Sequence, residues 1–147
     1  MTRQAVEQAL GLIAATPGYE AVALRLRQTP IYLSPALSDR AQTSLRGHIT
    51  LGHEPFVGTA DAACVSLAGT LVHEHRHLRQ NPLEKTASFW LGIAKRRHPM
   101  RRYEAPAYAA QQEFLRALAR YHPALQELAQ EELREVQTAF AFHYGAP

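Results

Sequence analysis

The sequence predicts a mostly helical α+β domain in which a small antiparallel sheet packs on one central helix. Three observations support this fold class. Apolar residues recur at helical spacing over most of the chain. Two short segments rich in β-branched or aromatic residues lie between residues 30 and 52. The 147 residues, 46% of them hydrophobic, suit a single domain spanning 1–147 with its own core.

The N-terminal third is predicted to combine short helices with both strands. Val6, Leu10 and Ile13 mark one face of the first helix, and Pro17 and Gly18 end it. The expected elements are a helix over 2–15, a short helix or turn over 19–28, strands at 30–33 and 47–51, and a loop at 53–58.

Helices are predicted for most of the remaining chain, over 61–80, 83–97, 103–121 and 124–142. Asn81 and Pro82 end the first of these helices. Pro106 and Pro123 fit near the starts of the last two, where a missing backbone N–H does little harm.

The composition predicts a soluble, cytoplasmic protein. Cys64 is the single cysteine, so no internal disulfide can form, which suits a reducing compartment. The N-terminus does not read as a secretory signal, and the longest mostly apolar stretch, 60–72, contains Asp61 and is too short to cross a bilayer. We therefore expect no membrane partner. The formal net charge of +3 is too small to indicate nucleic-acid binding by itself.

The pentapeptide HEHRH at residues 73–77 is an HExxH motif within the predicted helix 61–80. Residues four apart on a helix differ by about 40° around its axis, so His73 and His77 point the same way. Two imidazoles on one face can both bind a single Zn²⁺, with Glu74 beside the water that the ion holds. The motif therefore predicts a catalytic zinc site.

The neighbouring residues of this helix support that interpretation. His75 lies about 200° around the axis from His73, so we expect it to be a hydrogen-bonded core histidine or to support the site from behind. Cys64 faces the same way and is expected to be a small buried hydrophobe. On the His73 face the preceding turns carry small residues, which leave room for an ion and a substrate: Ala62, Ser66, Gly69 and Thr70.

A catalytic zinc site usually takes a third protein ligand. The extended motif HExxHxxGxxH is excluded, because Gln80 and Leu83 occupy the positions of its glycine and last histidine. Glu104 is the favoured ligand: it shares a helical face with the small Ala107 and follows the motif by enough chain for one helix and a turn. The alternatives that stay open are Glu113 and His98.

The motif at 73–77, followed by Glu104-x-x-Ala-Tyr108, resembles the gluzincin metallopeptidases, and the short chain is similar to the compact minigluzincin-type proteins. The resemblance covers roughly residues 30–115. It implies a zincin-like fold with His73, His77 and Glu104 as zinc ligands and Glu74 as the catalytic base. It also implies that the strand at 47–51 is an edge strand that receives an extended peptide.

The chemistry implied is hydrolysis of a peptide bond in a peptide or protein substrate. Zinc lowers the pKa of its water and polarises the carbonyl, while Glu74 takes a proton and passes it to the leaving amine. Tyr108 is the first candidate for the donor that stabilises the oxyanion. Tyr103 and His53 are weaker candidates.

Two alternatives differ in partner. One is a regulatory protease that cleaves a single partner protein, as in the ImmA/IrrE family, which also carries HExxH and a downstream glutamate. The other is a nucleic-acid or interaction module that uses the basic segment 95–102, although nucleic acid is the less favoured partner. A zinc scaffold without catalysis is a third possibility, but a purely structural site has no need of Glu74.

Overall fold

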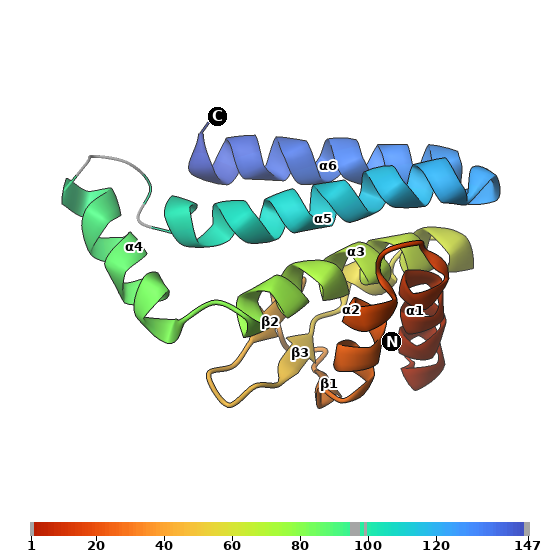
Figure 1. Cartoon of the computed structure of the whole chain (residues 1–147), viewed down its shortest axis with the longest axis horizontal. Helices are drawn as coiled ribbons and strands as arrows, with labels where there is room; N and C mark the ends of the chain where they lie inside the picture. Colours follow the sequence, from red (N-terminus) through yellow and green to blue (C-terminus); the bar gives the residue numbers. More distant parts are fainter. Residues whose placement is uncertain (1, 95–97, 99, 146–147) are drawn as a thin grey trace.

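The structure is a computed structural model that describes the chain except residues 1, 95–97, 99 and 146–147, and the side chains of 82, 84, 89 and 92–94 (Figure 1). The helices are α1 (Arg3–Ala15), α2 (Glu20–Arg27), α3 (Ala60–Leu78), α4 (Pro82–Ala94), α5 (Arg101–Tyr121) and α6 (Gln126–Tyr144). The strands are β1 (Ile31–Leu33), β2 (Ala41–Thr43) and β3 (Ile49–Leu51), and short 3-10 turns span Glu54–Phe56 and Pro123–Leu125.

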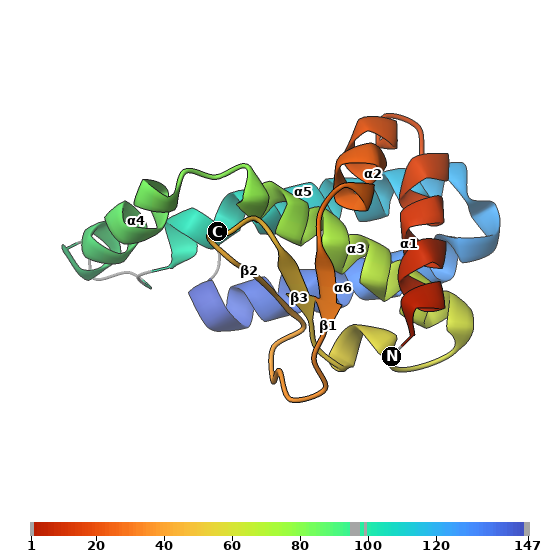
Figure 2. The same ribbon diagram turned by 90° about the horizontal axis from the view of Figure 1, so that it is seen from below.

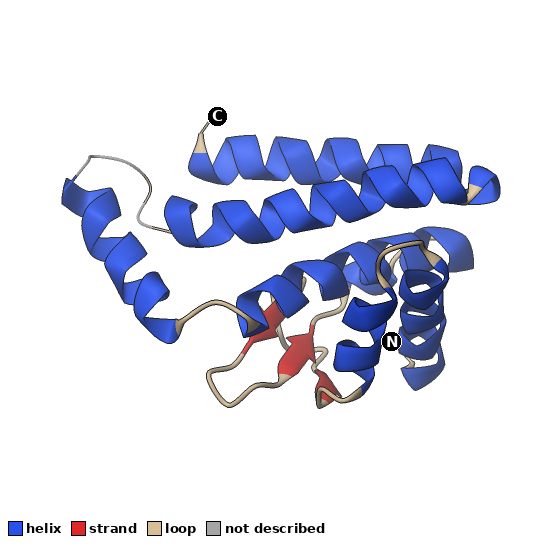
Figure 3. Ribbon diagram, viewed as in Figure 1, coloured by secondary structure: helices blue, strands red, loops and turns tan. Residues whose placement is uncertain are grey.

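The mostly helical α+β class is confirmed (Figure 3). Each expected helix is present with small shifts at its ends, and residues 95–97 of the expected helix 83–97 lie outside the described residues. Pro106 lies inside α5 rather than near its start, because α5 already begins at Arg101. None of the helices in the described part of the chain is long and apolar enough to cross a bilayer.

Helix α3 is the centre of the fold. It packs against α1, α2 and β2 on one side and against α5 and α6 on the other (Figures 1 and 2). Leu67 and Leu71 of α3 are fully buried, as are Phe114 and Leu118 of α5. Thr59 caps α3, since its side chain accepts a hydrogen bond from Ala62 N at 3.2 Å. The core thus fixes the helix that carries residues 73–77.

The sheet has the order β1-β3-β2 and is mixed, with β1 parallel and β2 antiparallel to β3. The sequence-based prediction of an antiparallel sheet is therefore wrong for the pairing of β1 with β3, which is parallel. The expectation that 47–51 forms an edge strand is also wrong, because β3 lies between its two neighbours. The sequence missed β2, whose three residues, Ala-Gln-Thr, carry no strong strand pattern. A turn at Gly47, with φ of 78°, joins β2 to β3 and places β3 in the middle.

Gly52 fixes the approach of the loop before β2 to the end of β3. A Cβ atom at this position would lie 2.0 Å from the backbone oxygen of Asp39 and 3.0 Å from that of Leu37. Only glycine fits here, and the close approach holds residues 38–43 beside α3.

Candidate metal centre

The last turns of α3 and the first turns of α5 build the site. Gly69 of α3 faces α5, where a Cβ atom would lie only 3.3 Å from Gln111 Nε2. Ala107 of α5 is fully buried in the contact between the two helices. Small residues on both helices therefore allow a close approach, which carries Glu104 to the HExxH motif. Gly69 was expected to leave room for an ion and a substrate, but the space beside it is filled by Gln111 and Leu115 of α5.

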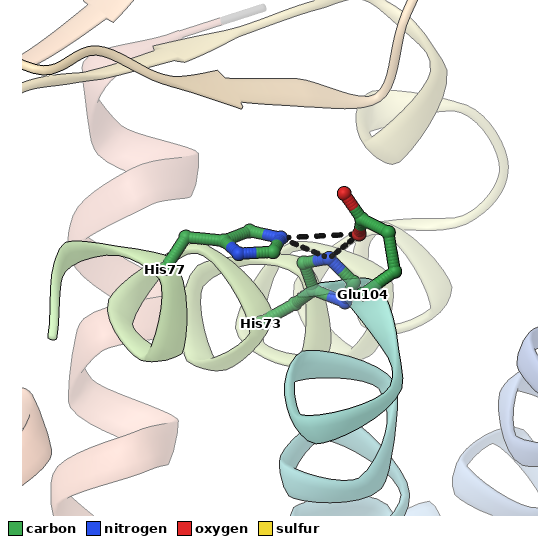
Figure 4. Close-up of side chains that lie close together, drawn as sticks. All are labelled: His73, His77 and Glu104. Atoms are coloured by element: carbon green, nitrogen blue, oxygen red, sulfur yellow. Dashed lines mark hydrogen bonds and ion pairs between the residues drawn. The ribbon is translucent and has the colours of Figure 1, made fainter. Parts of the chain in front are cut away.

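His73, His77 and Glu104 converge on one point (Figure 4). The two Nε2 atoms lie 3.0 Å apart. Glu104 Oε2 lies 3.2 Å from His77 Nε2 and 3.4 Å from His73 Nε2. Three potential ligand atoms thus form a nearly equilateral triangle, and the predicted association of these three residues is confirmed in the structure.

This triangle fits a tetrahedrally coordinated ion. Bonds of about 2.0–2.1 Å from zinc to nitrogen or oxygen, at tetrahedral angles, separate neighbouring ligand atoms by about 3.3 Å. The observed sides of 3.0, 3.2 and 3.4 Å are close to that value. The three residues could therefore hold one metal ion with little rearrangement.

Two glutamines orient the imidazoles from behind. His73 Nδ1 lies 3.1 Å from Gln111 Oε1, and His77 Nδ1 lies 2.6 Å from Gln80 Oε1. An amide oxygen only accepts, so each Nδ1 carries the proton and each Nε2 offers its lone pair to the site. Gln80 in turn donates from Nε2 to the backbone oxygen of Tyr103 at 2.7 Å. Both glutamines suit metal binding by these imidazoles.

The supporting roles of the two glutamines were not among the features expected from the sequence. Gln111 lies seven residues after Glu104, on the same face of α5, which was a usable signal. Gln80 lies three residues after His77, beyond the end of α3, and the sequence analysis used it only to exclude the extended motif.

Aromatic rings enclose the two histidines. The Tyr103 ring stacks on the His77 ring with centroids 4.7 Å apart, and the Tyr108 ring meets the edge of His73 at 4.8 Å. Burial, together with the nearby charge of Glu104, raises the pKa of Tyr108. Its hydroxyl therefore stays protonated at neutral pH and able to donate a hydrogen bond.

The electrostatics of the site keep Glu104 ionised. Burial by itself would raise the pKa of Glu104, but its close contacts with His73 and His77, and the positive charge that these rings carry when they are protonated, lower it to about 2. Burial opposes the charged form of His77, but the contact with Glu104 outweighs it and raises the pKa of this imidazole. The carboxylate is thus available as an anionic ligand at neutral pH.

Glu74 is buried beside the triad and held from the sheet. Thr43 of β2 donates a hydrogen bond from Oγ1 to Glu74 Oε2 at 2.5 Å, and Thr43 Oγ1 also lies 3.3 Å from the backbone oxygen of Glu74. Only 5% of Glu74 is exposed. The sequence analysis missed Thr43, because nothing in the sequence connects β2 with α3.

A cavity of about 650 Å³ opens over these groups. Its wall includes β2 and the loop before it, the triad, Glu74, Tyr103, Tyr108, and residues of α6 such as Val136, Ala139 and Tyr144. Burial raises the pKa of Tyr144, to about 12. The cavity is large enough for several residues of an extended chain beside β2.

Other candidates lie away from the triad. His98 is exposed, and its ring meets Tyr144 at 4.8 Å, while Glu113 is exposed on α5. His53 lies at the start of the first 3-10 turn and does not contribute to the described cavity wall. Of the basic segment 95–102, residues 95–97 and 99 lie outside the described residues.

The two residues expected on the far side of α3 behave differently. His75 is buried, but its Nε2 atom has no hydrogen-bond partner among the described residues, so the expected hydrogen bond is not found for that nitrogen. Burial and nearby arginines lower the pKa of His75, which keeps it neutral. Cys64 is half-buried and packs against the core, and burial raises the pKa of its thiol.

The described residues thus define a group of two imidazoles and one carboxylate that could hold a metal ion, with a second carboxylate beside it. No protein-family model, curated protein or solved structure matches this chain. The function is therefore inferred from the site alone.

Proposed function

We propose that this chain is a zinc-dependent metallopeptidase of the gluzincin type. The observation that carries the proposal is the position of Glu74, which is buried, lines the same cavity as His73, His77 and Glu104, and is hydrogen-bonded to Thr43. A site that only bound metal for stability would have no use for a further buried carboxylate. A set of two histidines and one glutamate is typical of catalytic zinc.

His73, His77 and Glu104 would hold the ion. When bound, zinc supplies a Lewis acid that polarises a carbonyl group and makes water a nucleophile at neutral pH. Glu74 Oε2 is engaged by Thr43, so Oε1 is the atom that takes a proton and then delivers it to the leaving amine. Tyr108 lines the cavity and remains protonated, which suits a donor to the substrate carbonyl oxygen.

Strand β2 is the surface on which we propose that an extended peptide binds. It is an edge strand, whereas β3, the strand expected from the resemblance, already pairs on both sides. Arg40 and Ser44 form backbone hydrogen bonds to the β3 side. Because bonded residues alternate in an antiparallel ladder, the backbone groups of Ala41 and Thr43 face the outer edge. A peptide added there lies along the cavity.

The test uses Glu74→Gln, with Glu113→Gln as the matched control on an exposed site of α5. We expect both variants and the wild type to bind one zinc per chain, measured by elemental mass spectrometry. Glu74→Gln should lose hydrolysis of a fluorogenic peptide library by about 100-fold or more, because it lacks the base, and Glu113→Gln should keep it. Equal activity in Glu74→Gln, or no hydrolysis by the zinc-loaded wild type, would overturn the proposal.

A further inference from the structure

Helix α4 extends beyond the rest of the molecule at one end. Figures 1 and 2 both show it directed away from α1, α2 and the sheet. Its packing is mainly against α5. Ser88, which is 1% exposed, marks the side of α4 that faces the protein, and its Oγ accepts a hydrogen bond from Tyr103 N at 3.0 Å. The opposite side of the helix includes residues that are exposed to solvent.

The exposed residues on this side of α4 include large apolar side chains. Leu83 is 73% exposed, Trp90 63% and Leu91 37%. With the exposed Ala87 they recur at intervals of four, three and one residues, so they share one face of the helix. An exposed apolar face of this kind often marks a site that contacts another protein or a membrane.

The positive charge of the chain is concentrated in the stretch of sequence that contains Trp90 and Leu91 and follows them. Residues 85–102 contain six Lys and Arg and no Asp or Glu. The chain has 16 basic and 13 acidic residues, so the rest of it carries 10 basic and 13 acidic residues, a net charge of −3. The excess of basic residues is therefore carried by this stretch of sequence, in which Lys85 lies over the Tyr103 ring, on the side of α4 that faces the protein.

We propose that the outward face of α4 binds the surface of an anionic lipid bilayer. A short helix with Trp and Leu on one face and basic residues around it lies in the interface plane, with its apolar side among the acyl chains and its cations near the headgroups. Thirteen residues of helix are about 20 Å long, too short to cross a bilayer, so α4 lies on the membrane surface. This proposal departs from the sequence expectation of no membrane partner, which rested on the lack of a segment able to cross a bilayer.

The observations favour lipid over two other occupants. A nucleic acid would use the basic residues, but exposed leucines add nothing to phosphate contacts. A second copy of the chain, packed face to face on α4, would pair two copies of a stretch that has six basic and no acidic residues, which opposes association. An anionic lipid surface uses the apolar and the cationic residues at once.

Trp90 is the only tryptophan of the chain, so the unmodified protein reports on this face directly. We expect its fluorescence to shift to shorter wavelength with vesicles of phosphatidylcholine and phosphatidylserine, and not with phosphatidylcholine alone. Lipids brominated on the acyl chain should quench it, and added salt should weaken the binding. Unchanged emission with anionic vesicles at low salt would overturn the proposal.

Two variants locate the contact while Trp90 is kept. Leu83→Ser with Leu91→Ser should reduce partitioning into anionic vesicles by about tenfold or more, since two leucine side chains no longer enter the apolar layer. Leu24→Ser is the matched control, because Leu24 is 60% exposed on α2, away from α4. Equal loss in both variants would count against α4 as the contact, and circular dichroism checks that each is folded.

The other occupants give different signals. A shift that grows with protein concentration in the absence of vesicles would assign the face to a second copy. A response to duplex DNA but not to vesicles would assign the region to nucleic acid. Either result would overturn the lipid proposal. The assay reads neither zinc nor hydrolysis, so its outcome is independent of the proposed peptidase function.

Discussion

Two clusters of polar side chains lie along α3 and attach it to different helices. In the first half of α3, Ser66 meets Arg40, whose Nη2 donates to Glu132 Oε1 of α6 at 2.8 Å. In the last turns, His73 and His77 meet Glu104 of α5. Both clusters are largely buried and both join residues that are far apart in the chain.

The clusters differ in where their positive charge comes from. The first contains its own cation, the guanidinium of Arg40, which also lies 3.3 Å from Glu54. The second brings two imidazole nitrogens and a carboxylate oxygen together with no Lys or Arg among them. Three acceptors facing one another require a proton or a cation between them. The first cluster therefore carries its own compensating charge, whereas the second could hold an external cation.

The largest expected effect is on metal-dependent stability. Zinc at a thousand times its dissociation constant should raise the free energy of unfolding by about 4 kcal/mol, because it binds only the folded site. His77→Ala should abolish that gain, seen as loss of the shift in melting temperature between zinc and chelator. His98→Ala, an exposed histidine, is the control. If zinc still raises the melting temperature of His77→Ala, the second cluster is not the site that binds the ion.

Removing the internal cation should destabilise the protein without involving metal. Arg40→Met leaves Glu132 buried and unpaired, which costs roughly 3 kcal/mol. Urea unfolding should show the same loss with zinc and with chelator. Arg46→Met, on an exposed turn, should be nearly neutral. A large fall in zinc affinity in Arg40→Met would show that the two clusters are coupled.

A smaller effect should come from the residues behind the imidazoles. Gln111→Ala removes the hydrogen-bond acceptor of His73 Nδ1 and should lower zinc affinity about 10–100-fold. The next residue, Gln112, faces Arg116 instead, and Gln112→Ala is the control. Competition with a fluorescent chelator measures both affinities. Equal affinities would mean that packing alone holds His73 in place.

The second cluster could be predicted because helical periodicity sets most of its geometry. Four-residue spacing places His73 and His77 on one face, and small Ala107 marks the face that carries Glu104 towards them. The seven-residue step from Glu104 to Gln111 follows the same rule. Local regularity therefore specified that His73 and His77 lie together and favoured Glu104 over Glu113 and His98, and it offered a signal for Gln111 that was not used.

The first cluster and the sheet could not be predicted in this way. Arg40 and Glu132 are separated by 92 residues, and neither belongs to a motif. Strand β2 has three residues and depends on a glycine turn and on the close approach at Gly52. Thr43 reaches Glu74 only after that strand has formed. These contacts arise from tertiary packing, so a periodic pattern in the sequence does not contain them.

The smallest expected effect is a dependence of the free energy of unfolding on pH through Glu132 of the first cluster. Burial raises the pKa of Glu132, although Arg40 opposes the shift. The folded protein then holds the proton more tightly than the unfolded chain, so stability due to this group is present below the ordinary pKa of 4.5 and falls as pH rises to the raised value. Glu132→Gln does not titrate. The wild-type free energy of unfolding minus that of the variant should therefore decline over this window and then level off, in urea titrations from about pH 4 to 7. If this difference in the free energy of unfolding stays constant with pH, Arg40 fully offsets the effect of burial on the pKa of Glu132.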